Sequence, residues 1–172
     1  MPKLTLDTYI RAPQRRCFDL ARDVGVHCQT AVSTEERVLP PGVTEGRLEL
    51  GDTVIFEARH LGVRQRLEAR ITRMDAPRSF TDEMVRGVFK SLIHVHLFLP
   101  TDGGRATTMR DELAWVSPLG PLGRIADALL VTRHLRNFLR TRALGLKAIA
   151  EASQPAGENL AAQGGATVRS KV

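Results

Sequence analysis

The fold is decided by residues 118–151, PLGPLGRIADALLVTRHLRNFLRTRALGLKAIAE. The larger apolar side chains recur there in steps of three, four and seven, which places them on one stripe of a single long helix. They are Leu122, Ile125, Leu129, Leu135, Phe138, Leu139, Leu146 and Ile149. Ser117 suits the N-cap and Pro118 the first helical position, so we expect the helix to begin there. Such a helix crosses a small domain and needs an apolar surface to lie on.

That surface is predicted by a series of short alternating segments earlier in the chain. Residues 3–10 read as a strand, residues 13–24 have helical spacing, and a second short helix is predicted over residues 27–32. Turn signals then separate further strands at 53–61, 63–74, 79–86, 89–99 and 105–116. Short connections make such strands antiparallel neighbours. We therefore predict an α+β fold, in which a curved antiparallel sheet wraps around the long C-terminal helix.

Size and composition fit one such domain over residues 1–151, followed by a disordered polar tail over residues 152–172. No apolar run is long enough to span a membrane, and the N-terminus lacks the apolar block of a signal peptide. Cys17 and Cys28 lie outside any CxxC spacing and are expected to stay reduced. We expect a cytoplasmic protein without stable membrane insertion, and the sequence leaves a homodimer open.

A net charge of +6 and an isoelectric point near 10.1 raise the question of an anionic partner. Much of this charge lies on the long helix, with a spacing typical of a solvated face opposite the apolar stripe. There is no zinc-finger spacing, aromatic RNA-binding strand or phosphate-binding loop, so we expect no nucleic-acid partner. One possible function is therefore that a partner protein or an acidic membrane binds this arginine face.

Hairpin arithmetic places the polar side chains. A two-residue turn at Gly103-Gly104 or Asp102-Gly103 puts His94, His96 and Asp111 on one face with Trp115. A turn at Gly87-Val88 would add Glu83 to the same face. Apolar neighbours indicate that this face is the concave one, although a three-residue loop with a bulge would exchange the two faces.

Two imidazoles and two carboxylates in a partly dry cavity could form a site, a plain hydrogen-bonded network or a metal centre. The catalytic candidates are His94, His96, Glu83 and Asp111, none assigned with a role, and we predict no metal and no cofactor. His27 could join the cavity, whereas His134 is expected to be exposed. The predicted ligand-binding lining is Phe56, His60, Leu67, Glu83, Leu92, His94, His96, Phe98, Met109, Asp111, Leu113, Trp115, Leu122, Ile125 and Leu129.

Several motifs together resemble the START-like polyketide cyclase/dehydrase superfamily, SRPBCC. They are FTDEMVRGVFK at 80–90, His94-x-His96-x-Phe98, Asp111-Glu112, SPLGPLG at 117–123, Ile10-x-Ala12-Pro13 with Phe18, and Gly51-Asp52. The resemblance covers roughly residues 3–151. It implies a helix-grip fold and a hydrophobic small molecule or lipid bound between sheet and helix. It also implies an alternative, an enzyme of the polyketide cyclase/dehydratase type. The resemblance maps no catalytic residues, so for this alternative the His/carboxylate cluster in the same cavity rests on the hairpin pairing.

Overall fold

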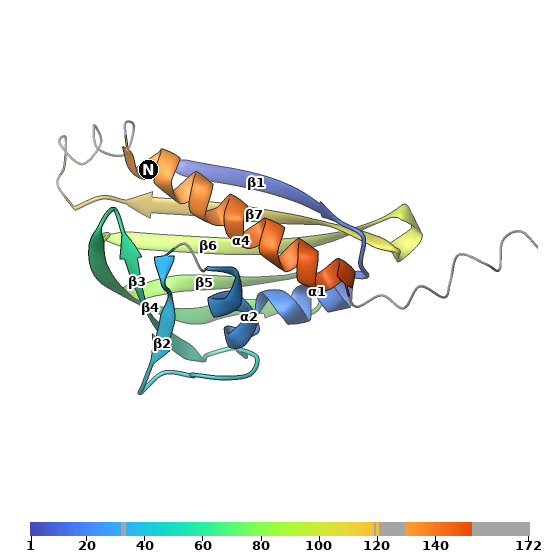
Figure 1. Cartoon of the computed structure of the whole chain (residues 1–172), viewed down its shortest axis with the longest axis horizontal. Helices are drawn as coiled ribbons and strands as arrows, with labels where there is room; N and C mark the ends of the chain where they lie inside the picture. Colours follow the sequence, from blue (N-terminus) through green and yellow to red (C-terminus); the bar gives the residue numbers. More distant parts are fainter. Residues whose placement is uncertain (32–33, 119, 121–129, 153–172) are drawn as a thin grey trace, which may run out of the picture.

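The computed structural model describes residues 1–31, 34–118, 120 and 130–152. Seven strands form one antiparallel sheet in the order β1-β7-β6-β5-β4-β3-β2 (Figure 1). They are β1 (Lys3–Ile10), β2 (Arg37–Leu39), β3 (Thr53–His60), β4 (Val63–Asp75), β5 (Ser79–Arg86), β6 (Ser91–Thr101) and β7 (Ala106–Val116). A short 3₁₀ turn, η2 (Asp102–Gly104), joins β6 to β7. The predicted antiparallel sheet is confirmed, while the three-residue β2 had no alternation in the sequence to reveal it.

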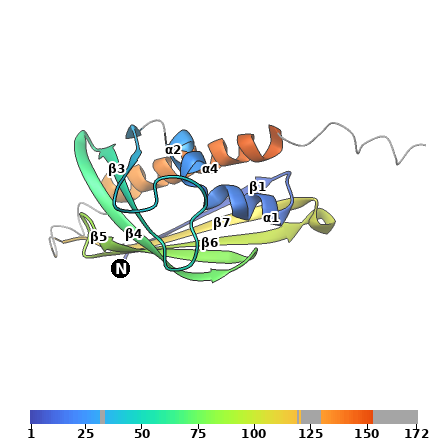
Figure 2. The same ribbon diagram turned by 90° about the horizontal axis from the view of Figure 1, so that it is seen from below.

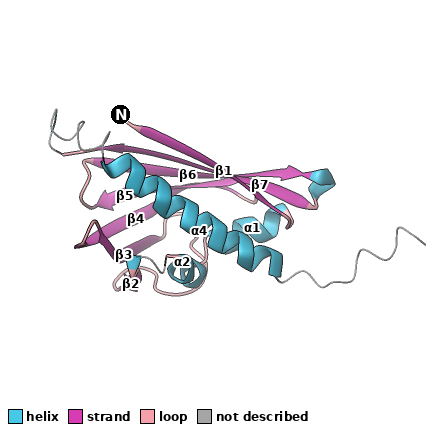
Figure 3. Ribbon diagram, turned by 45° about the horizontal axis from the view of Figure 1, so that its top comes forward, coloured by secondary structure: helices cyan, strands magenta, loops and turns pink. Residues whose placement is uncertain are grey.

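All helices of the described chain lie on one side of the sheet (Figure 2). α1 (Gln14–Ala21) and α2 (Val24–Thr30) follow β1, and α4 (Thr132–Ala152) crosses the concave face, as Figure 3 shows from another angle. This confirms the predicted α+β helix-grip architecture. The predicted beginning of the long helix is not seen at Ser117, which has no regular structure, or at Pro118, which lies in a turn. As described, α4 begins at Thr132 and extends through Ala152, while residues 119, 121–129 and 153–172, which include nearly all of the predicted tail, lie outside the described residues.

The boundary between α1 and α2 differs from the prediction because Asp23 interrupts the helical run. Its backbone is extended and its carboxylate accepts a hydrogen bond from the N–H of Val26 at 3.0 Å, which caps α2. Arg22, just before it, donates to the carbonyl of Leu48. The second helix therefore begins at Val24 rather than near His27.

The core lies between the helices and the concave face. Phe18 of α1 packs edge-on against Phe80 and Phe98, with ring centroids 5.9 and 5.6 Å away. Leu139, Ala143, Leu146 and Ala150 form the buried stripe of α4. In the described part of the chain, no helix is both long and apolar enough to cross a bilayer.

Candidate functional site

The pairing of β6 with β7 places two histidines and an aspartate on the concave face. His96 lies opposite Asp111 and His94 opposite Leu113, and the side chains at 94, 96 and 111 are buried. The connection spans residues 102–105 rather than two residues, yet an even loop length gives the same pairing. Their neighbours on this face include Trp115, which is fully buried.

Glu83 does not share this face, which corrects its predicted position. A turn at Gly87-Val88 would have paired Glu83 with Leu92, but the register pairs Glu83 with Ile93 and Asp82 with His94. A shift of one residue turns a side chain to the other side of a sheet. Glu83 consequently accepts an exposed hydrogen bond from Thr72, 3.0 Å away, and Asp82 takes its place beside the histidines.

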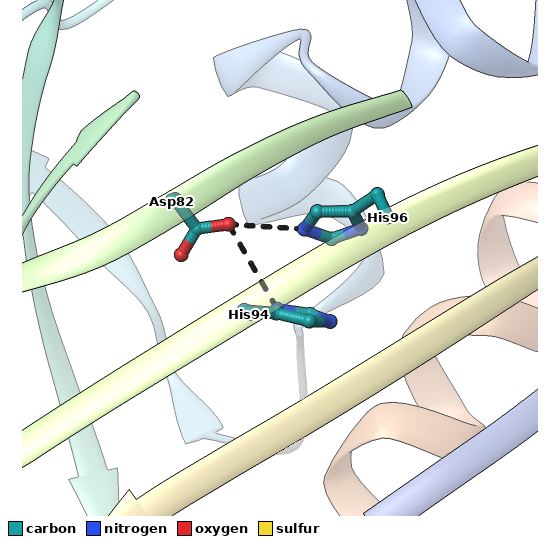
Figure 4. Close-up of side chains that lie close together, drawn as sticks. All are labelled: Asp82, His94 and His96. Atoms are coloured by element: carbon teal, nitrogen blue, oxygen red, sulfur yellow. Dashed lines mark hydrogen bonds and ion pairs between the residues drawn. The ribbon is translucent and has the colours of Figure 1, made fainter. Parts of the chain in front are cut away.

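Asp82, His94, His96 and Asp111 form one buried cluster, which we call the inner cluster. His94 Nε2 lies 3.0 Å from Asp111 Oδ1, and His96 lies between two carboxylates, with Nε2 3.0 Å from Asp82 and Nδ1 3.0 Å from Asp111. The two imidazole centroids are 3.8 Å apart. Figure 4 shows Asp82 reaching from β5 toward both rings.

The pKa values of the two imidazoles of the inner cluster shift in opposite directions. Burial opposes the charged form of His96, but hydrogen bonds with Asp111 and Asp82 outweigh it and raise its pKa. Burial and the neighbouring His96 lower the pKa of His94. Despite burial, hydrogen bonds from both rings hold the pKa of Asp111 below its usual range. His96 therefore takes up a proton more readily than His94, which is neutral at pH 7.

A cavity of about 220 Å³ lies beside the inner cluster, between the sheet and α4. Its walls are mostly apolar. Six of the predicted lining residues contribute to it: Phe56, His60, Leu67, Leu92, His94 and Leu113.

The other predicted lining residues lie elsewhere. His96, Met109 and Asp111 border a much smaller hollow of about 10 Å³ under α4. Phe98 and Trp115 are packed in the core. Leu122, Ile125 and Leu129 fall outside the described residues.

A second polar group, His27, Glu36 and Arg142, lines the same cavity, and we call it the outer triad. His27 Nε2 is 3.0 Å from Glu36 Oε1, and its Nδ1 accepts from Arg142 at 2.8 Å. The ring also stacks on Phe56, with centroids 4.1 Å apart. Burial and the charge of Arg142 lower the pKa of His27 to about 4, so the ring is neutral at pH 7.

The outer triad has unused hydrogen-bonding capacity. Among the described residues, Glu36 Oε2 and Arg142 Nε are buried without a partner. Buried polar atoms are usually paired, so such atoms beside a cavity call for an explanation. The sequence allows His27 to join the cavity and gives no signal for Glu36. Arg142 was expected on the solvated basic face of the helix, and the structure corrects this, because a residue three after Leu139 and four before Leu146 lies on the buried stripe of α4.

His60 and His134 form a further pair at the cavity wall, with His60 Nδ1 2.9 Å from His134 Nε2. His134 is partly buried rather than exposed as predicted, because it packs against His60. His134 also borders a wider surface groove, which shares Leu61 and Phe138 with the cavity. The side chains of Leu61, His134 and Phe138 therefore lie between the cavity and the groove.

No protein-family model and no curated protein matches the sequence. Solved structures do match. The protein TTHA0849 from Thermus thermophilus has a TM-score of 0.73 at 19% identity, over 90% of this chain and 100% of that chain. The Zhui aromatase/cyclase from Streptomyces sp. R1128 has a TM-score of 0.70 at 13% identity, over 87% and 93%.

A START superfamily protein from Mycobacterium smegmatis has a TM-score of 0.66 at 12% identity, over 87% of this chain and 97% of that chain. These structures match nearly their whole length, so the likeness concerns the complete domain. At such identities it shows the fold alone. This chain has the helix-grip fold of the START-like (SRPBCC) proteins.

Proposed function

We propose that this protein binds a hydrophobic small molecule or lipid in the cavity between the sheet and α4. The observation that carries the proposal is the cavity itself, which side chains leave open although protein interiors are normally close-packed. Its volume of about 220 Å³ exceeds the roughly 150 Å³ of an engineered apolar cavity that takes up benzene. An apolar pocket with a few polar groups is the usual form of a small-molecule site.

The polar groups of the cavity set the chemistry of the proposed ligand. Leu92 and Leu113 provide apolar contacts, and the outer triad supplies an acceptor at Glu36 and a donor at Arg142. Glu36 and Arg142 carry opposite charges, so together they favour a neutral polar group. The proposed ligand therefore has an apolar body and a neutral donor or acceptor group, such as a hydroxyl or carbonyl.

Two measurements on the purified full chain test this proposal. Native mass spectrometry detects a small molecule that copurifies with the protein, and titration with 1-aminoanthracene detects an apolar cavity through increased fluorescence. Ala58 and Leu92 line the cavity, so Ala58→Phe and Leu92→Phe should fill it and abolish the fluorescence increase. Val85→Phe, at an exposed position of β5, is the matched control and should bind the probe like the wild type.

A folded wild-type chain that neither carries a small molecule nor binds the probe would contradict the proposal. Equal probe binding by the cavity-filling variants would contradict it too, because the probe would then lie elsewhere. Circular dichroism establishes that each variant is folded.

The alternative function is a polyketide cyclase/dehydratase-type reaction, and one observation favours it. His94 is a neutral imidazole at the cavity wall, and Asp111 accepts from its Nε2 and so fixes the tautomer. Its Nδ1 is then the basic atom that could take a proton from a bound substrate.

A linear poly-β-carbonyl thioester tests this alternative, with mass spectrometry following ring closure and loss of water. His94→Gln should abolish turnover while 1-aminoanthracene still binds. Turnover at the wild-type rate in that variant would exclude His94 as the base. We further expect a cytoplasmic location, and a homodimer stays a prediction that sedimentation can test.

A further inference from the structure

Three atoms capable of binding a metal face one another where β5 and β6 pair. Asp82 Oδ2 lies 3.0 Å from His96 Nε2 and 3.9 Å from His94 Nδ1, and the three atoms lie within 4.8 Å of one another (Figure 4). A tetrahedral ion with ligands about 2.0–2.2 Å away separates them by about 3.4 Å. The two measured separations bracket that value, so small side-chain movements would suffice.

Asp111 supplies the second half of such a site. Its Oδ1 lies 3.0 Å from His94 Nε2 and 3.0 Å from His96 Nδ1, on the other edge of each ring. Histidine ligands of metals commonly donate the remote N–H to a carboxylate, which fixes the tautomer and the ring orientation. Here one carboxylate faces both remote nitrogens, and the near nitrogens face Asp82.

The charges of the inner cluster fit a cation. Side chains of Asp82 and Asp111 are only 19% and 6% exposed, and buried negative charges need a nearby positive charge. A divalent ion would balance both carboxylates and leave both imidazoles neutral.

We propose that Asp82, His94 and His96 bind one divalent transition-metal ion and that Asp111 orients the two rings. Two imidazoles and one carboxylate suit zinc, iron(II) and cobalt(II). This goes beyond ligand binding, because the ion needs no molecule in the cavity. It also departs from the metal-free expectation of the sequence, which placed Glu83 where Asp82 lies.

Cobalt(II) and zinc(II) alone are the probes for the test. The full chain, without a histidine tag and stripped with EDTA, is titrated with Co²⁺ while its visible absorption is recorded. Bound Zn²⁺ is counted by elemental analysis after dialysis. We expect one ion per chain and a metal-dependent rise in melting temperature. Asp111→Asn should weaken binding about 10- to 100-fold, and Asp82→Asn, His94→Gln and His96→Gln more than that.

Two matched controls separate this site from general surface binding. Glu83→Gln changes the neighbouring carboxylate on the opposite face, and His134→Gln removes a member of the other histidine pair. Both should keep the wild-type Co²⁺ affinity.

The proposal is overturned if the folded wild-type chain takes up neither ion, or if the folded Asp82→Asn chain binds as tightly as wild type. The wild-type titration decides the matter even where a ligand variant fails to fold. A cluster that is only a hydrogen-bonded network would show itself by lower stability of Asp82→Asn in EDTA, with no effect of metal on the wild-type melting temperature.

Discussion

Asp82 and Glu83 are neighbours in the sequence, yet they lie on opposite faces of β5. Asp82 contacts buried His96, whereas Glu83 forms an exposed hydrogen bond with Thr72. Removing the charge of Asp82 leaves the buried ring of His96 with one charged partner instead of two. The stability of the chain should therefore depend on residue 82 and hardly at all on residue 83.

Asp82→Asn in metal-free protein should lower the free energy of unfolding by about 3 kcal/mol, the size expected when a buried ion pair loses one member. Glu83→Gln should change it by less than about 0.5 kcal/mol. Urea denaturation followed by circular dichroism measures both. Equal effects of the two substitutions would mean that Asp82 is not part of a buried ion pair.

His27 should make the chain less stable in acid. Its pKa in the folded chain is about 4, against 6.5 in the unfolded chain, so protons bind the unfolded state more tightly. This contribution is fully present above pH 6.5 and is lost as the pH falls through 4. The shift corresponds to about 3 kcal/mol at most.

His27→Gln can keep the hydrogen bonds to Glu36 and Arg142 but cannot take up the proton. The free energy of unfolding of this variant should depend less on pH between about 4 and 6.5 than that of the wild type. Urea denaturation at several pH values measures the difference. His134→Gln is the control, since this ring is less buried than His27 and a smaller change is expected. If the free energy of unfolding of His27→Gln depended on pH as strongly as that of the wild type, His27 would not be the source of the acid sensitivity.

At the level of elements, α4 packs against the rest of the protein through one of its faces. Leu139 and Leu146 are 3% and 5% exposed, whereas Leu144 on the same helix is 52% exposed. Leu139→Ala should therefore lower the free energy of unfolding by about 2–5 kcal/mol, because it removes buried atoms and leaves a cavity.

Leu144→Ala is the matched control, because it makes the same substitution as Leu139→Ala in the same helix. Its effect should be below about 0.5 kcal/mol. Thermal or urea denaturation compares the two. If Leu144→Ala were as damaging as Leu139→Ala, the exposed side of α4 would have to be covered by something in solution.

The pairing of strands shows how far element-level prediction reaches. The β6–β7 pairing followed from counting because an even loop keeps the alternation of faces. The same counting failed at β5, where Glu83 pairs with Ile93 and an odd rather than an even number of residues separates the two partners. The length of the loop between β5 and β6 depends on the path of the chain in space. The presence of Gly87 did not by itself specify that length.

For the whole molecule, occupation of the cavity should stabilise the fold. A compound that binds only the folded chain adds about 2.7 kcal/mol at a concentration 100 times its dissociation constant. For a domain of this size we expect the melting temperature to rise by about 5–10 °C. Differential scanning fluorimetry with 1-naphthol measures the shift, and Ala58→Phe should show none.

The sequence by itself determined the layers of this protein. The spacing of apolar residues, with a period of 3.6 in the helix and of 2 in the strands, shows which faces are apolar. A long amphipathic helix and an antiparallel sheet have few ways to bury both apolar faces. They also placed His94, His96 and Asp111 on the concave face. These features are local, since each depends on the spacing of residues along one or two neighbouring elements.

Only the tertiary structure decided which polar groups from distant segments meet. His27 of α2, Glu36 ahead of β2 and Arg142 of α4 are far apart in the sequence, and no spacing links them. Asp82 joined the inner cluster through a register fixed by one connection. Contacts between distant segments depend on how helices sit on the sheet, and that packing is a property of the folded chain as a whole.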